Sequence, residues 1–172
     1  MDLVVVGFQG RHRAAQVLTD LRQRGAQLFD LDQAITVSWE DRRNFIVQQS
    51  INLSREEGGR WARLWGAFIN ATLFQPFTER LSAAANKVAN KNGEQTALTR
   101  DWWVSDIGIP DDFVRDVGAL VQPGESAIIT LAEEFDPHSA VSALRDCGGS
   151  LIYTSLSGEQ VNKVKKELGH DN

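Results

Sequence analysis

The chain has 172 residues, of which 42% are hydrophobic and 24% are charged, a composition typical of a globular protein. Its 18 Lys and Arg residues against 23 Asp and Glu residues give a net charge of −5. This balance makes nucleic acid a poor candidate partner, because phosphate binding draws on an excess of basic residues. The single cysteine, Cys147, excludes an internal disulfide and any metal site with several cysteine ligands.

The first third of the chain has the pattern of a strand, a helix and a hairpin. The apolar run Leu3–Phe8 predicts a short buried strand, and Arg11–Arg24 predicts an amphipathic helix that ends at Gly25. Two segments that alternate apolar and polar residues, Ala34–Glu40 and Asn44–Ile51, predict the two strands of a hairpin.

The middle of the chain predicts aromatic amphipathic helices. Helical spacing places an apolar stripe on residues 59–74, and Pro76 separates this segment from a second one at residues 77–88. The longest nearly uninterrupted apolar stretch, Leu64–Phe74, is too short for the roughly 20 residues that span a bilayer. We therefore expect no membrane-spanning helix here.

The last third alternates helices and strands. A helix begins near Pro110, strands cover Ala127–Ala132 and Leu151–Thr154, and a helix covers Pro137–Cys147 between them. A terminal helix begins at Ser157, where a capping-box pattern occurs.

The two ends of the chain match each other at one constant register. In this register Val5 falls on Ile128, Leu21 on Leu144 and Gly25 on Gly148. Two matching β-α-β units predict an α+β fold, a ferredoxin-like split β-α-β sandwich with an inserted amphipathic helical segment. A chance match between unrelated units is the alternative. We expect one domain with an insertion, made of residues 1–54, the aromatic insertion 55–104, and residues 105–172.

Few residues suggest catalysis or ligand binding. His12 and His138 begin two helices that this fold would orient in opposite directions, so we expect solvent-facing histidines rather than a metal site. Cys147 ends a helix, where a thiolate is not activated. The turn with Gly7, Gly10 and Arg11 offers backbone amides to an anion, but the signal is weak and we favour the explanation that a tight strand-to-helix turn needs the glycines. We predict no catalytic residues, metal or cofactor.

The aromatic insertion is the strongest candidate for an interface. It could cover the sheet, pack against another copy of the chain, or lie in a membrane interface, and the scarcity of Lys and Arg disfavours the membrane. We favour a subunit interface. The predicted interface residues are Trp61, Leu64, Trp65, Phe68, Phe77, Leu81, Trp102 and Trp103.

Several short motifs resemble one bacterial family, the domain of unknown function 1269. The resemblance covers residues 2–54 and 105–168, and its motifs are Leu3–Phe8, Ile107–Phe113, Gln122–Ala127 and Thr154–Ser157. It implies a small protein of unassigned function, often labelled a membrane protein because many members have a glycine-rich apolar hairpin in the middle. This chain departs there, since its central segment carries tryptophans and little glycine. The family offers no catalytic residues to carry over.

These observations predict a non-enzymatic, self-associating protein whose aromatic insertion mediates assembly or docking. Its partner would be itself or another protein. The alternatives are a sensor that binds a small anionic ligand at the Gly7–Arg11 turn, and a protein peripheral to the membrane. The start of the chain has no basic segment or cleavage site, so we expect a cytoplasmic location or one at the inner face of the membrane.

Overall fold

The computed structural model describes residues 1–25, 34–41, 44–49, 55–73 and 106–168. Their contacts divide the chain into two compact units. The first consists of Met1–Asn52 and Ala119–Gly158, and the second of Leu53–Gly118 and Glu159–Asn172. The predicted division into three segments stays a prediction.

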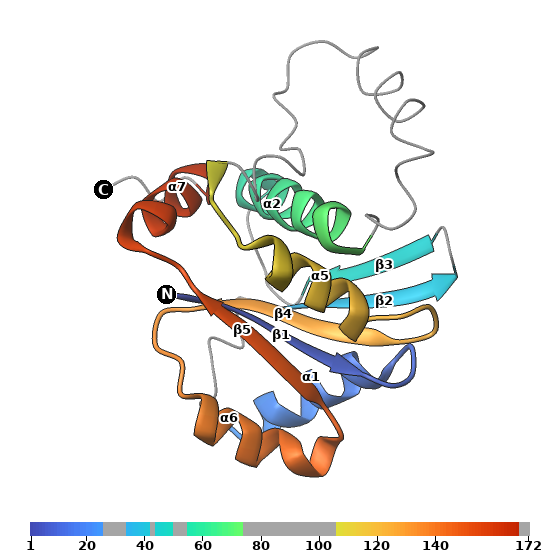
Figure 1. Cartoon of the computed structure of the whole chain (residues 1–172). Coiled ribbons are helices and arrows are strands. Elements are labelled where there is room, and N and C mark those ends of the chain that lie inside the picture. The colour runs from blue at the N-terminus through green and yellow to red at the C-terminus, as the bar shows by residue number, and fades with distance from the viewer. Residues whose placement is uncertain (26–33, 42–43, 50–54, 74–105, 169–172) are drawn as a thin grey trace. The chain divides into compact units, whose positions relative to one another are not determined.

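The described part of the first unit is a five-stranded antiparallel sheet with two helices on one face (Figure 1). The strands are β1 (Asp2–Phe8), β2 (Ile35–Asp41), β3 (Asn44–Gln49), β4 (Ser126–Ala132) and β5 (Ser150–Ser155). They lie in the order β3-β2-β4-β1-β5, and every neighbouring pair is antiparallel. The α+β class predicted from the sequence is therefore confirmed.

The two helices of this unit are α1 (Arg13–Gln23) and α6 (Pro137–Leu144), and a short 3-10 turn, Arg145–Cys147, continues α6. The helix α1 ends at Gln23, and the predicted stop, Gly25, follows its C-cap with a φ of +63°, a left-handed conformation that glycine adopts without strain. Both helices follow the strand predicted before them, and their bounds agree with the sequence prediction to within a few residues.

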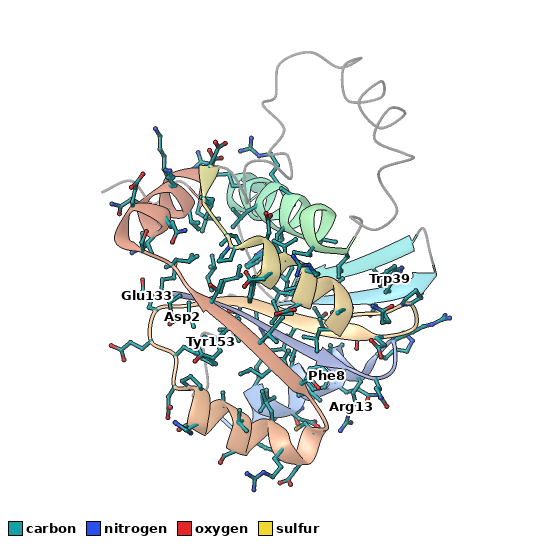
Figure 2. The ribbon with its side chains drawn as sticks, viewed as in Figure 1. Asp2, Phe8, Arg13, Trp39, Glu133 and Tyr153 are labelled. Atoms are coloured by element: carbon teal, nitrogen blue, oxygen red, sulfur yellow. The ribbon has the colours of Figure 1, made fainter. Side chains whose placement is uncertain are left out.

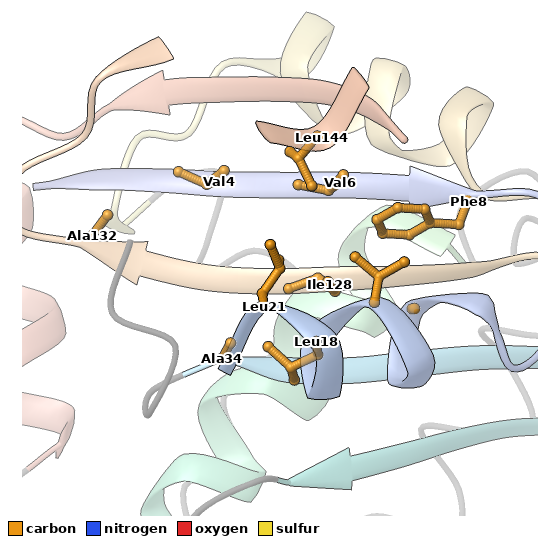
Figure 3. Packing of buried hydrophobic residues seen from close by; sticks show 11 residues of the cluster. Val4, Val6, Phe8, Leu18, Leu21, Ala34, Ile128, Ala132 and Leu144 are labelled. Carbon is orange, nitrogen blue, oxygen red and sulfur yellow. The ribbon is translucent and has the colours of Figure 1, made fainter. Parts of the chain in front are cut away.

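The core of the first unit lies between this helix pair and the sheet (Figure 3). Alternate residues of β1 and β4 point into it, and α1 contributes one apolar face. The members of the cluster are Val4, Val6, Phe8, Ala14, Val17, Leu18, Leu21, Ala34, Ile128, Ala132 and Leu144. The intervening residues Leu3, Val5, Ile129 and Leu131 are also at most 2% exposed. Because both faces of these strands are buried, the sequence of β1 is a nearly unbroken run of apolar residues.

The constant register proposed for the two halves is not kept by the strands. Val5 stands opposite Ile129, whereas Ile128 stands opposite Val6, so Val5 and Ile128 face opposite sides of the sheet. In the helices, Leu21 and Leu144 are both buried. The same register also places Leu18 on Val141, but Leu18 is buried whereas Val141 is 48% exposed. A residue-by-residue register is therefore wrong for the strands.

The described part of the second unit is helical. It contains α2 (Arg55–Leu73), most of α5 (Asp111–Leu120) and nearly all of α7 (Gly158–Leu168). A Cβ added to Gly118 would lie 2.7 Å from the carbonyl oxygen of Thr72, so the missing side chain lets α5 approach α2 closely. The side chains of Gln160 and Lys163 donate hydrogen bonds to the carbonyls of Gly108 and Asp106, at 3.0 and 2.6 Å. None of the described helices is long and apolar enough to cross a membrane.

Candidate functional site

Three of the predicted interface residues are interior residues of the chain. Leu64, Trp65 and Phe68 share one face of α2 and are at most 1% exposed, and the Trp65 and Phe68 rings meet edge to face with centroids 5.8 Å apart. In the folded chain these three side chains are not open to a partner. The side chain of Trp61, and the whole of Phe77, Leu81, Trp102 and Trp103, lie outside the described residues. An interface through those five stays a prediction.

Two backbone amides that directly follow the predicted anion-binding turn are hydrogen-bonded within the chain. Gly10 adopts a φ of +97° before α1, and the buried hydroxyl of Ser126 bonds to both sides of the turn. Ser126 Oγ accepts a hydrogen bond from the Ala14 N–H at 3.0 Å and donates one to the Gly10 carbonyl at 2.6 Å. The Arg13 N–H donates to the same carbonyl. Two amides of the first turn of α1 are therefore already bound, and anion binding at Gly7, Gly10 and Arg11 stays a prediction.

Gly7 has a packing role rather than a place in the turn. It lies inside β1, where an added Cβ would come within 2.6 Å of Leu120 Cγ and 3.1 Å of the Leu120 carbonyl oxygen. The glycine is needed because the last residue of α5 rests directly on the strand.

Two of the three histidines lie at opposite ends of the sheet, and His170 lies outside the described residues. His12 precedes α1 at the end where Phe8 pairs with Ser126, and His138 begins α6 beyond the end where Ala132 pairs with Asp2. Over the part of the chain that the structure describes, no three His, Cys, Asp or Glu side chains are grouped so as to hold a metal ion.

The strand β5 forms one edge of the sheet among the strands that the structure describes. The strand pairs with β1 over six positions, and no other described strand lies on its far side (Figure 1). The sequence from Cys147 to Gly158 contains no charged residue and no proline. Charges, prolines and bulges are the usual means by which proteins protect an edge strand from pairing with another chain. The edge of β5 has no charge or proline to protect it.

Hydrogen bonds fix which backbone groups of β5 face outward. The Leu156 N–H donates to the Met1 carbonyl at 3.0 Å, and these two residues continue the register in which Asp2 is opposite Ser155. Because the direction of the backbone groups alternates along a strand, every second residue from Leu156 backward faces β1. The N–H and C=O groups of Leu151, Tyr153 and Ser155 therefore point away from the sheet.

The opposite side of the sheet gives the same alternation. The Trp39 N–H donates to the Glu125 carbonyl at 2.9 Å, so the odd-numbered residues of β4 face β2 and the even-numbered ones face β1. The even-numbered residues of β1 must then face β4, which leaves the odd-numbered ones to face β5. The assignment of outward groups on β5 thus rests on bonds at two separate places in the sheet.

Tyr153 is the prominent side chain of this edge. It is 44% exposed, and its ring meets that of Phe135 edge to face, with centroids 5.1 Å apart. Figure 2 shows Tyr153 beside β5, with Asp2 and Glu133 labelled near the same end of the sheet. The hydroxyl of Ser155 donates to the Asp2 carboxylate at 2.5 Å, which ties the end of β5 to β1. A strand that has no charged residue of its own and carries one exposed aromatic ring can accept another strand at its edge.

The sequence prediction found this strand but not its position at the edge. The available signal was the run without charge from Cys147 to Gly158, in a chain where 24% of residues are charged. That signal alone does not identify an edge, because a central strand such as β4 also lacks charge.

Comparison with known proteins places the chain in one family. A family model described as "Protein of unknown function (DUF1269)" matches residues 60–169. The match includes much of the middle of the chain, which was expected to differ from the family, and it begins after residues 2–54, which were expected to resemble it. Comparisons with curated proteins and with solved structures gave no match. The matched range is more than half of the chain, and this protein belongs to the DUF1269 family of proteins of unknown function.

Proposed function

We propose that this protein is a self-associating interaction protein, and that a second copy of the chain adds to the sheet at the free edge of β5. The observation that carries the proposal is this edge itself. Leu151, Tyr153 and Ser155 present outward backbone groups along a strand that has no charge or proline to block pairing. Strand addition satisfies such groups with main-chain hydrogen bonds.

The charge of the chain favours this edge as the place where two copies meet. Each copy has a net charge of −5, so two copies repel one another over most of their surfaces. The charge-free segment from Cys147 to Gly158 lets the strands approach without bringing like charges together. Self-association was predicted through the aromatic insertion, and the burial of Leu64, Trp65 and Phe68 is the reason why we now assign it to β5.

We further propose that the first unit is a ferredoxin-like split β-α-β sandwich with one added strand. The order β2-β4-β1-β5, with α1 and α6 as the two crossovers, supports this assignment. In this interpretation β3 extends the sheet beyond β2, and β5 forms the opposite edge of the described strands.

The test is the mass of the protein in solution when a charge is placed on the edge. Tyr153→Lys should weaken association by roughly tenfold or more, because a lysine on an edge strand opposes pairing with another strand. Val141→Lys is the matched control, since Val141 is similarly exposed, at 48%, but lies on α6. Light scattering after size exclusion should give twice the chain mass of 19.1 kDa for the wild type and the control, and a lower mass for Tyr153→Lys.

Two outcomes contradict the proposal. One is a wild type that stays at the mass of a single chain at every concentration. The other is a folded Tyr153→Lys variant that associates as strongly as Val141→Lys. Circular dichroism and thermal unfolding of both variants establish that each is folded before their masses are compared.

A further inference from the structure

We infer that the two copies join β5 to β5 in antiparallel orientation, about a twofold axis that passes beside Tyr153. This inference rests on the proposed function and adds the register of the contact. A dimer of identical chains closes on itself when the same surface serves both partners, which for one edge strand means pairing with its own copy around a twofold axis. Such an axis makes the two strands antiparallel.

The outward backbone groups restrict the register. They belong to Leu151, Tyr153 and Ser155, so hydrogen bonds form only where these residues stand opposite one another. When Tyr153 faces Tyr153 of the second copy, Leu151 faces Ser155 and Ser155 faces Leu151. All three residues of each strand are then paired. A shift of two residues in either direction leaves one of the three outside the paired part of the strand.

The side chains suit the same register. Val4 is opposite Tyr153 and Val6 is opposite Leu151, so Tyr153 and Leu151 lie on the face of the sheet that α1 and α6 cover. The two exposed Tyr153 rings would lie directly across from one another, each already supported by Phe135. Aromatic pairs opposite each other on neighbouring strands stabilise a sheet.

The opposite face is equally compatible with this pairing. There, Ile152 of one copy would face Thr154 of the other, and both are β-branched residues that pack well across strands. No position in the paired segment brings two like charges together. The two five-stranded sheets would then continue into one another across the axis.

Cysteine cross-linking tests the register in the full-length chain. In a Cys147→Ala background, which removes the natural thiol, Tyr153→Cys places two thiols at the axis. The Cα atoms of directly opposite residues in a hydrogen-bonded antiparallel pair are about 5.5 Å apart, within the range that a disulfide spans. Ser155→Cys is the control, because in this register the two Ser155 positions are separated by roughly 14 Å along the strands.

With copper phenanthroline as the oxidant, we expect Tyr153→Cys to form the covalent dimer at least about tenfold faster than Ser155→Cys, because only its thiols lie within disulfide reach. A mixture of Leu151→Cys and Ser155→Cys chains should form the mixed dimer, because those positions face each other. Equal or faster cross-linking of Ser155→Cys alone, in a protein that has the mass of a dimer, overturns the register while the proposed function stands. A wild type with the mass of a monomer overturns both.

Discussion

Ser126 links two segments that are far apart in the sequence. A helix leaves its first amides without partners inside the helix, and His12, the residue before α1, makes no side-chain hydrogen bond that would cap them. The buried Ser126 at the start of β4 takes that role by accepting from the Ala14 N–H and donating to the Gly10 carbonyl. One hydroxyl group thus holds the start of α1 against the central strand.

Replacing this hydroxyl should destabilise the fold more than replacing an exposed one. Ser126→Ala leaves a buried amide without an acceptor, and we expect the free energy of unfolding to fall by about 1–3 kcal/mol. The control is Ser38→Ala, whose exposed hydroxyl donates to the Arg11 carbonyl and should contribute about 1 kcal/mol or less. Urea unfolding of the two variants measures both losses. If the free energy of unfolding falls by the same amount in both variants, the Ser126 hydroxyl does not hold α1 against β4 more strongly than an exposed hydroxyl would.

At the scale of the element, α6 has a strong N-terminal cap. Asp136 precedes Pro137, and its carboxylate accepts hydrogen bonds from the His138 N–H at 3.1 Å and the Ser139 N–H at 3.3 Å. The Ser139 hydroxyl donates to the same carboxylate. The bond from this hydroxyl, followed by that from the His138 amide, lowers the pKa of Asp136 below its ordinary value of 3.8.

This cap should make stability depend on pH in acid. Because the pKa of Asp136 is lower in the folded chain than in the unfolded chain, its charge stabilises the fold above the ordinary pKa of 3.8, and that stabilisation is lost as the pH falls through the lowered pKa. Asp136→Asn keeps an acceptor without the charge. The melting temperature of the wild type should exceed that of Asp136→Asn at neutral pH, and the difference should shrink in acid.

A second variant connects the pH effect to its cause. Ser139→Ala removes the hydrogen bond that lowers the pKa of Asp136 most, so the acid-sensitive range of the difference should move to higher pH. A difference between wild type and Asp136→Asn that stays constant with pH contradicts the assignment.

At the scale of the whole molecule, the proposed dimer brings together two chains that each carry a charge of −5. Salt screens repulsion between distant surface charges, and the paired segment contains no ion pair that salt could weaken. We therefore expect the dimer to become more stable as the salt concentration rises. Sedimentation at several salt concentrations measures this, and a dimer that dissociates in salt would indicate ion pairs at the interface instead.

Local patterns predicted the elements well because each element has a local cause. The apolar run of β1 and the proline before α6 mark their positions directly in the sequence. The interface residues were harder to predict. The spacing of Leu64, Trp65 and Phe68 shows that α2 has an apolar face, but the same spacing results whether a partner or the chain itself covers that face.

Local sequence patterns could not predict the order of the strands in the sheet either. That β5 lies at an edge follows only from pairings between distant segments, and a shift of one residue in such a pairing turns a side chain to the other face. This is why the match of Val5 with Ile128 failed although both residues lie in correctly predicted strands.

The central place of β4 also has a consequence for the order in which a nascent chain folds. β1 and β2 do not pair with each other, since β4 lies between them, and β4 begins only at Ser126. Before that segment leaves the ribosome, only β2 and β3 among the described strands have each other as a pairing partner, and an isolated hairpin is marginally stable in water. The sheet of the first unit therefore cannot form until the last third of the chain has been synthesised. Until then, a ribosome-bound chaperone would have to shield the apolar β1 segment.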